Sequence, residues 1–352
     1  MSDQNAIFTH KPQINLSCPS SGRMWIIFCC ALACVIQSAL NDGGRSIVLA
    51  VTALLTALIT EFFFTFRKYG ARKILDGSTS ATAMILVMIL PNFTSPFHVV
   101  VASIFAIAVV KYSFGGLGSN WFNPALGGWL LIRFSWPEGF VQALGDFSVS
   151  DYASAGNASA AGGAVTEFLN NTILSVAGVQ LPAGYIDLLF YSGQGLITDR
   201  GLFILLIGTI LITAIGINKT WIPIVFLAVY GFLIRLAGDF GGILWNGDIL
   251  YGFFSGGTMA AAFILTAEPS SGAKLKGGVI FTVALSAFFS WFFRYKCMEY
   301  SGCFIAIALT NSLTPIVRVI EDKFFLSRGF KWNSLFKKIR FDESDSAGEN
   351  PL

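Results

Sequence analysis

Two short segments rich in glycine, threonine and alanine repeat one another in the two halves of the chain. Residues 77–86 read GSTSATAMIL and residues 256–265 read GGTMAAAFIL, and six of the ten positions are identical. The identical positions include Gly77 with Gly256 and Thr79 with Thr258. Residues of this kind let helices approach closely, or let a helix break so that its backbone faces a ligand. The repeat therefore predicts a ligand site where two related units meet, with close-packed helix lacking a ligand as the alternative.

Two asparagines lie next to prolines in apolar runs and extend this candidate site. Asn123 precedes Pro124, and Asn311 lies four residues before Pro315. An amide in lipid needs a hydrogen-bond partner, and it can pair with the uracil-like edge of a flavin or with a quinone carbonyl. Hydrogen bonding between helices is the alternative. The predicted non-covalent binding residues are Gly77, Thr79, Asn123, Gly256, Gly257, Thr258 and Asn311.

Among the ionisable residues within apolar runs or at their ends, where charge is costly, four are of particular interest. Glu61 is nearest to the interior of its run, and a carboxylate there predicts a place on the pathway of a cation or a proton. For Lys111, Arg133 and Glu268 we expect the charged end of the side chain to reach the membrane surface.

Cysteine and histidine give no pattern typical of a metal centre. The six cysteines include no Cys-x-x-Cys pair, and the chain has two histidines. We therefore expect no zinc or iron–sulfur site built within this chain alone and no haem bound by a histidine pair. An iron–sulfur cluster shared with a neighbouring subunit remains an open alternative.

The elements that must position these residues are membrane-spanning helices. Hydrophobic residues make up 54% of the 352 and charged residues 12%, against roughly 25% charged residues in soluble domains. We expect an all-α polytopic membrane protein, in which the short runs 78–91 and 122–136 are broken or re-entrant helices. The ten predicted spans are 24–40, 45–66, 78–91, 97–113, 122–136, 201–217, 220–237, 249–267, 276–293 and 301–320.

The distribution of lysine and arginine predicts the orientation. Positive residues are more frequent in the loops that share a side with both termini, so we expect both termini in the cytoplasm. With ten spans, each half has five helices, so the second half enters the membrane from the opposite side to the first. The two halves are then inverted repeats. The predicted division is a cytoplasmic lead over 1–23, a first repeat over 24–136, an external loop over 137–199, a second repeat over 200–320, and a cytoplasmic amphipathic and disordered tail over 321–352.

Three motifs resemble those of the RnfD/NqrB family of membrane subunits, and the short N-terminus is closer to RnfD. They are WFNPALGGWLL, GGTMAAAFILTAEPSSG and YSGCFIAIALTNSLTPIVRVI. The resemblance covers about residues 24 to 322. It implies a bacterial inner-membrane subunit of ten helices, with one FMN esterified to a threonine of an external loop and a riboflavin between the helices.

The chain departs from the family pattern at the covalent flavin site. The family motif resembles D-x-x-S-G-A-T, whereas residues 151–171 read DYASAGNASAAGGAVTEFLNN. Val165 stands where the threonine is expected, and a valine side chain has no oxygen to esterify. Thr166 is the first candidate for FMN attachment and Ser159 the second, with loss of covalent attachment as the third possibility.

The resemblance implies an electron-transfer subunit of an ion-translocating oxidoreductase that moves Na⁺ or H⁺. Such a protein does not act alone: its partners are the other subunits of an Rnf- or Nqr-type complex, the lipid bilayer and a quinone, and we expect no nucleic acid. The alternative function is a solute channel or secondary transporter without a redox cofactor, because inverted repeats serve that role too.

Overall fold

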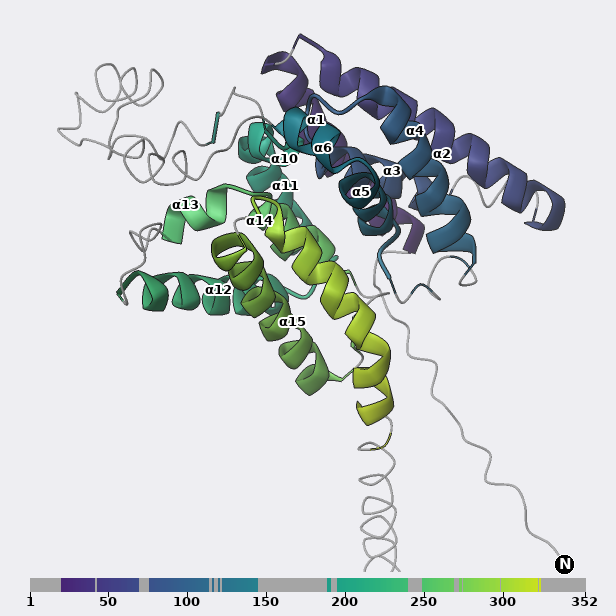
Figure 1. Ribbon diagram of the computed structural model, residues 1–352. Coiled ribbons are helices and arrows are strands. Elements are labelled where there is room, and N and C mark those ends of the chain that lie inside the picture. The colour runs from purple at the N-terminus through teal and green to yellow at the C-terminus, as the bar shows by residue number, and fades with distance from the viewer. Residues whose placement is uncertain are drawn as a thin grey trace, which may run out of the picture.

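The computed structural model describes residues 20–41, 43–69, 76–113, 116, 120, 122–144, 189–190, 195–239, 249–268, 272–273, 275–297, 299–321 and 323. Helices account for most of these residues (Figure 1). The external-loop prediction and the predictions for both terminal segments fall largely outside the described residues.

The first half consists of helices that surround one short central helix. Helix α3 contacts α1, α2 and α5, and α2 also contacts α4. The bounds are α1 (Ser20–Asn41), α2 (Arg45–Tyr69), α3 (Ser78–Met88), α4 (Pro96–Ile104), the π-helix η2 (Phe105–Tyr112) that continues α4, α5 (Pro124–Ser135) and α6 (Pro137–Leu144).

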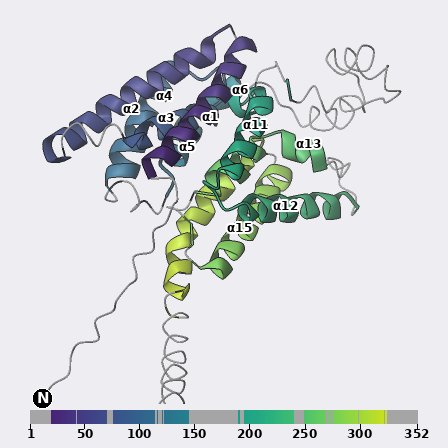
Figure 2. The same cartoon turned by 180° about the vertical axis from the view of Figure 1, so that it is seen from behind.

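The second half forms a separate group of helices, and the view from behind shows the two groups side by side (Figure 2). Helix α12 packs on α15, and α11 joins the halves through its contacts with α1. The bounds are α10 (Ile197–Arg200), α11 (Leu202–Ala214), α12 (Trp221–Asp239), α13 (Ile249–Phe254), α14 (Thr258–Ala260), η3 (Ala261–Leu265), α15 (Lys276–Trp291), η4 (Phe292–Lys296) and a last helix, Gly302–Glu321.

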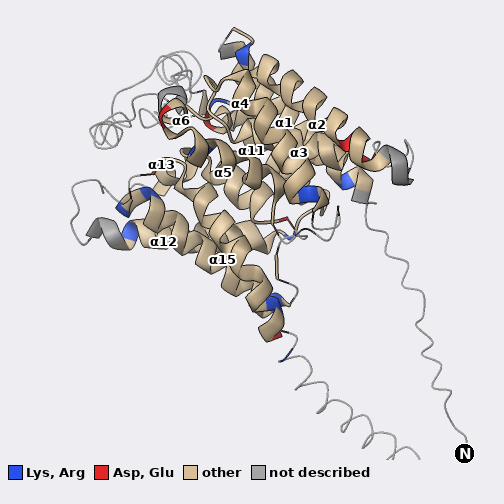
Figure 3. Cartoon of the chain, turned by 45° about the vertical axis from the view of Figure 1, so that its right-hand side comes forward, with Lys and Arg blue, Asp and Glu red and all other residues tan. Residues whose placement is uncertain are grey.

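The chain is a membrane protein. In the part of the chain that the structure describes, four helices are long and apolar enough to cross a bilayer, namely Ser21–Leu40, Arg45–Thr65, Lys276–Lys296 and Gly302–Glu321. Most of the described ribbon carries neither acidic nor basic residues (Figure 3). Helix α3 has 11 residues, which at about 1.5 Å per residue is too short for a hydrocarbon core of about 30 Å. This agrees with the expectation of a short helix over 78–91.

Glycines in the left-handed conformation start the two repeated segments. Gly77, with a φ of 76°, is the residue before α3, and Gly257, with a φ of 69°, is the residue before α14. Gly256 is also left-handed, with a φ of 64°. Because residues with a side chain rarely adopt this conformation, the glycines allow the chain to turn sharply into each helix. The predicted span 249–267 is therefore interrupted as well, between α13 and α14.

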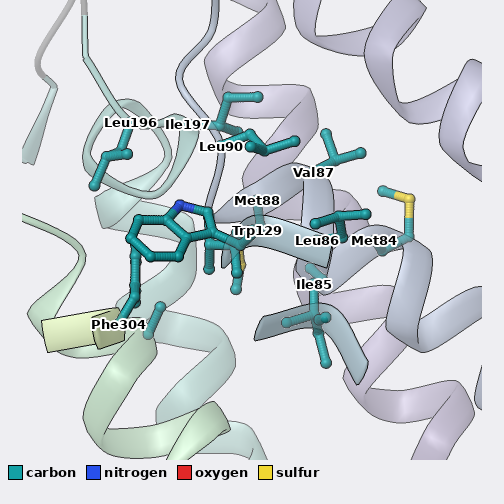
Figure 4. Close-up of a cluster of buried hydrophobic side chains, with 14 of the residues drawn as sticks. Met84, Ile85, Leu86, Val87, Met88, Leu90, Trp129, Leu196, Ile197 and Phe304 are labelled. Atoms are coloured by element: carbon teal, nitrogen blue, oxygen red, sulfur yellow. The ribbon is translucent and has the colours of Figure 1, made fainter. Parts of the chain in front are cut away.

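One hydrophobic core joins the halves around the indole of Trp129. This ring lies among side chains of α3, the segment before α10 and the last helix (Figure 4). Its centroid is 5.4 Å from that of Phe304 in an edge-to-face arrangement. Edge-to-face contacts of this kind add to the stabilisation from burial. The core thus holds the start of the last helix against α3 and α5.

Candidate functional site

A buried ammonium group lies at the start of α3. Lys111 Nζ, from the π-helix η2, donates to Glu61 Oε1 at 2.9 Å, Ser78 Oγ at 2.7 Å and Thr79 Oγ1 at 2.5 Å. Tyr112 OH donates to the same Glu61 oxygen at 2.8 Å. The Lys111 side chain is 3% exposed and that of Glu61 1%. We call the three oxygen-bearing residues Glu61, Ser78 and Thr79 the oxygen nest.

The expectation that Lys111 reaches the membrane surface is wrong. The side chain points into the protein because a carboxylate and two hydroxyls there replace its hydration. Glu61 is buried in the protein interior as expected, but its Oε2 atom has no hydrogen-bond partner among the described residues. A buried, half-satisfied carboxylate is costly, and such groups mark functional sites more often than packing.

A second buried cation lies at the start of α14. Arg294, from the π-helix η4, donates through Nη1 to Tyr230 OH at 3.0 Å, to the Gly252 carbonyl at 2.8 Å and to Thr258 Oγ1 at 3.0 Å. Its Nη2 donates to Ser255 Oγ. The residue is 1% exposed. The rigid fork of donors suits arginine to bind several acceptors at once.

Asp199 supplies the negative charge beside this second cation. Its carboxylate accepts from the backbone N–H of Gly256 at 3.2 Å and of Gly257 at 2.9 Å, and from Tyr300 OH at 2.7 Å. It also attracts the charge of Arg294. The two backbone donors are those that an interrupted helix leaves unpaired.

The two cation sites correspond to one another in the repeat. In each half a π-helix that ends a long helix places a cation on the repeated threonine, Thr79 or Thr258. π-Helices are rare and often occur at functional sites. Arg294 is not among the site residues predicted from the sequence, because it lies near the end of an apolar run, where a basic residue is expected to belong to a loop. The signal was the recurring pattern of two apolar residues, a basic residue and a tyrosine, VVKY at 109–112 and FFRY at 292–295.

Asn123 connects the halves. Its Oδ1 accepts from the backbone N–H of Ala125 at 2.8 Å and of Leu126 at 3.3 Å, which caps α5, while its Nδ2 donates to Glu268 Oε2 at 2.5 Å. Both residues line a cavity of about 140 Å³ together with Ser78, Thr82, Lys111 and Asn120. Glu268 thus binds Asn123 while remaining partly exposed, and the expectation that its charged end reaches the membrane surface stays a prediction.

Asn311 lines a second, larger cavity of about 460 Å³. Its Nδ2 is buried and donates no hydrogen bond to any described residue. The two cavities share Arg23, Ile217, Asn218 and Glu268, so they adjoin. Five hydroxyl residues also line the larger one, namely Thr266, Thr282, Ser286, Thr310 and Thr314.

The predicted glycines do not face either cavity. A side chain at Gly77 would meet the indole of Trp25 at 2.9 Å, and one at Gly257 would overlap the ring of Phe304. The glycines instead lie where the two short helices begin.

Arg133 Nη2 and Glu299 Oε2 form an ion pair at 2.6 Å, and each of the two side chains is about one-fifth exposed. Thr166 and Ser159 lie outside the described residues.

The interrupted helices, the paired buried cations and the cavities at the junction of the halves define a polytopic α-helical membrane protein with a polar site inside its helices. The chain belongs to the NQR2, RnfD, RnfE family, whose model matches residues 7–325.

Three relatives are similar along nearly their whole length. The D subunit of a proton-translocating ferredoxin:NAD(+) oxidoreductase complex from Clostridium ljungdahlii is 27% identical over 90% of this chain and 94% of that protein. The D subunit of an Na(+)-translocating ferredoxin:NAD(+) oxidoreductase complex from Acetobacterium woodii is 25% identical over 90% and 94%. The D subunit of an ion-translocating oxidoreductase complex from Psychromonas ingrahamii is 27% identical over 90% and 96%.

Proposed function

We propose that this protein is a membrane electron-transfer subunit of an ion-translocating oxidoreductase complex, passing electrons through FMN and riboflavin while Na⁺ or H⁺ is moved. The observation that carries the proposal is the match, over nine-tenths of the chain, to D subunits of ferredoxin:NAD(+) oxidoreductase complexes. Its partners are then the other subunits of such a complex and the surrounding lipid, with a quinone as a further candidate.

The proposed arrangement is ten spans in two inverted halves, in a bacterial inner membrane with both termini in the cytoplasm. Contacts between helix ends support it, because segments expected on one side contact each other. On the expected external side these pairs are Pro91 with Leu196 and Arg133 with Glu299. On the expected cytoplasmic side they are Arg318 with Gly272 and Leu275 with Glu321.

The larger cavity fits the ring of a non-covalent flavin. Its volume of about 460 Å³ lies within the range of roughly 300–1,000 Å³ usual for small-molecule sites. The Nδ2 of Asn311, which has no acceptor among the described residues, offers a hydrogen bond to a ring carbonyl. A bound flavin supplies transfer of electrons singly or in pairs. The protein's own residues orient the ring and keep water from it.

Paired asparagine variants test where a non-covalent flavin binds. We expect Asn311→Leu to lose more flavin than Asn123→Leu, because the Asn311 amide still has a donor to offer whereas both ends of the Asn123 amide are engaged. The measurement is flavin content per purified, monodisperse protein. The reverse ranking would place the ring in the smaller cavity, and full flavin content in both variants would remove it from these cavities.

The covalent flavin is tested on the loop itself. In protein from flavinylating cells, we expect peptide mass spectrometry of residues 137–199 to find FMN on Thr166, with Ser159 as the second site. Thr166→Val should abolish the adduct and its in-gel fluorescence, while Ser159→Ala should retain both. An unmodified loop in the wild-type protein would leave only non-covalent flavin.

The whole proposal is tested by purification from the native host. An electron-transfer subunit is expected to co-purify with peripheral redox subunits and to yield extractable flavin with a yellow absorbance band. A protein isolated alone and without chromophore would instead favour the channel or transporter function.

A further inference from the structure

We propose that the oxygen nest of Glu61, Ser78 and Thr79 is a binding site for a monovalent alkali cation, Na⁺, in which the Lys111 ammonium acts as a tethered substitute for that cation. The role rests on the proposed ion-translocating function and adds to it a site and an exchange mechanism.

The geometry around Lys111 Nζ is that of a bound cation. Three oxygens of different residues surround it at 2.5, 2.7 and 2.9 Å. Two of these oxygens are the side-chain hydroxyls of the first two residues of α3, and the third belongs to the Glu61 carboxylate, which supplies the negative charge that a cation needs there. Exchange of one singly charged cation for another keeps the buried Glu61 carboxylate compensated, which avoids the cost of a lone charge.

The second oxygen of Glu61 is a further, independent observation. The ammonium bonds to Oε1 and to the two hydroxyls, and Oε2 is left buried without a partner among the described residues. An ammonium group bonds through N–H groups of fixed direction. A metal ion has no such restriction and can bind both oxygens of one carboxylate at once. The nest is therefore better satisfied by a bare cation than by the lysine that fills it.

The adjoining cavity gives the ammonium a place to go. Lys111 and Ser78 both line the space of about 140 Å³ that also contains the carboxylate of Glu268. The lysine side chain is flexible, so its charged end can leave the nest and turn toward this second carboxylate. The same cavity adjoins the larger one, which gives a small cation a polar route to the nest.

The corresponding site in the second half lacks this freedom. The guanidinium of Arg294 is held by four acceptors, on α12, at the end of α13, at the break and on α14. These four acceptors are uncharged, and both oxygens of the nearby Asp199 carboxylate already accept hydrogen bonds from Gly256, Gly257 and Tyr300, so a metal ion there would find no carboxylate oxygen left open. Arg294 is thus the matched control for Lys111.

The test uses the purified full-length protein in choline chloride, with NaCl added stepwise. We expect Lys111→Gln to gain a rise in Tm of roughly 5 °C when Na⁺ is about 100 times its dissociation constant. The wild type, whose nest is filled by the ammonium, should respond less. Arg294→Gln should not respond, and the double variant Glu61→Gln/Lys111→Gln should lose the gain.

An unchanged Tm in Lys111→Gln would overturn the proposal, as would an equal rise in the double variant or in Arg294→Gln. If Lys111→Gln does not fold in choline, its monodisperse yield is compared after growth and extraction with and without NaCl. A several-fold higher yield with NaCl supports the site, and equal yields overturn it. Flavin content, measured on the same samples, reports on the electron-transfer function separately.

Discussion

Replacing Glu61 with glutamine is expected to lower the free energy of unfolding by about 3–5 kcal/mol, because it leaves a buried ammonium without its counter-charge. The Lys111 side chain is 3% exposed. Its remaining partners, Ser78 and Thr79, are neutral hydroxyls that cannot replace a carboxylate. The measurement is equilibrium unfolding of the detergent-solubilised protein by denaturant, in choline buffer without Na⁺.

The matched variants are Lys111→Gln and the double variant Glu61→Gln/Lys111→Gln. The double variant removes both charges, so we expect it to be more stable than either single variant, in contrast to additive effects. Additive losses would mean that Glu61 and Lys111 do not stabilise each other. A loss below about 1 kcal/mol in Glu61→Gln would mean that the ammonium has access to water.

Replacing Arg294 with methionine is expected to cost a similar amount, about 3–5 kcal/mol, because it removes the charge that compensates the buried Asp199. It also leaves Tyr230, Ser255 and Thr258 without the donor that joins three segments of the second half. The same unfolding experiment measures the loss.

Arg294→Lys is the control that keeps the charge. A lysine has a compact charge on a flexible stem and does not match the acceptors as the guanidinium fork does, so we expect an intermediate loss of stability. Wild-type stability in Arg294→Lys would show that charge alone matters at this position. Equal losses in both variants would show that the geometry of the hydrogen bonds decides.

Local sequence patterns determined the helices and their interruptions. Apolar runs predicted helices at the positions where they occur, because hydrophobic periodicity is encoded by residues near one another in the chain. The repeated glycines predicted breaks, and Gly77 and Gly257 indeed precede short helices in the left-handed conformation. The motifs around Asn123 and Glu268 were enough to indicate the family that the chain matches.

Whether the charged side chains are buried or exposed was decided by the tertiary structure alone. Lys111 and Arg294 each stand near the end of an apolar run, where a sequence predicts a surface position. They are buried because carboxylates and hydroxyls from distant segments meet them there, and no local pattern records such partners. In the same way Asn123 and Asn311 look alike in sequence. Packing gives hydrogen-bond partners to both ends of the Asn123 amide, whereas the Asn311 Nδ2 has no acceptor within the described part of the chain and lies beside a cavity. Burial of a charge or an amide depends on what other helices bring to it, and only the packed structure fixes that.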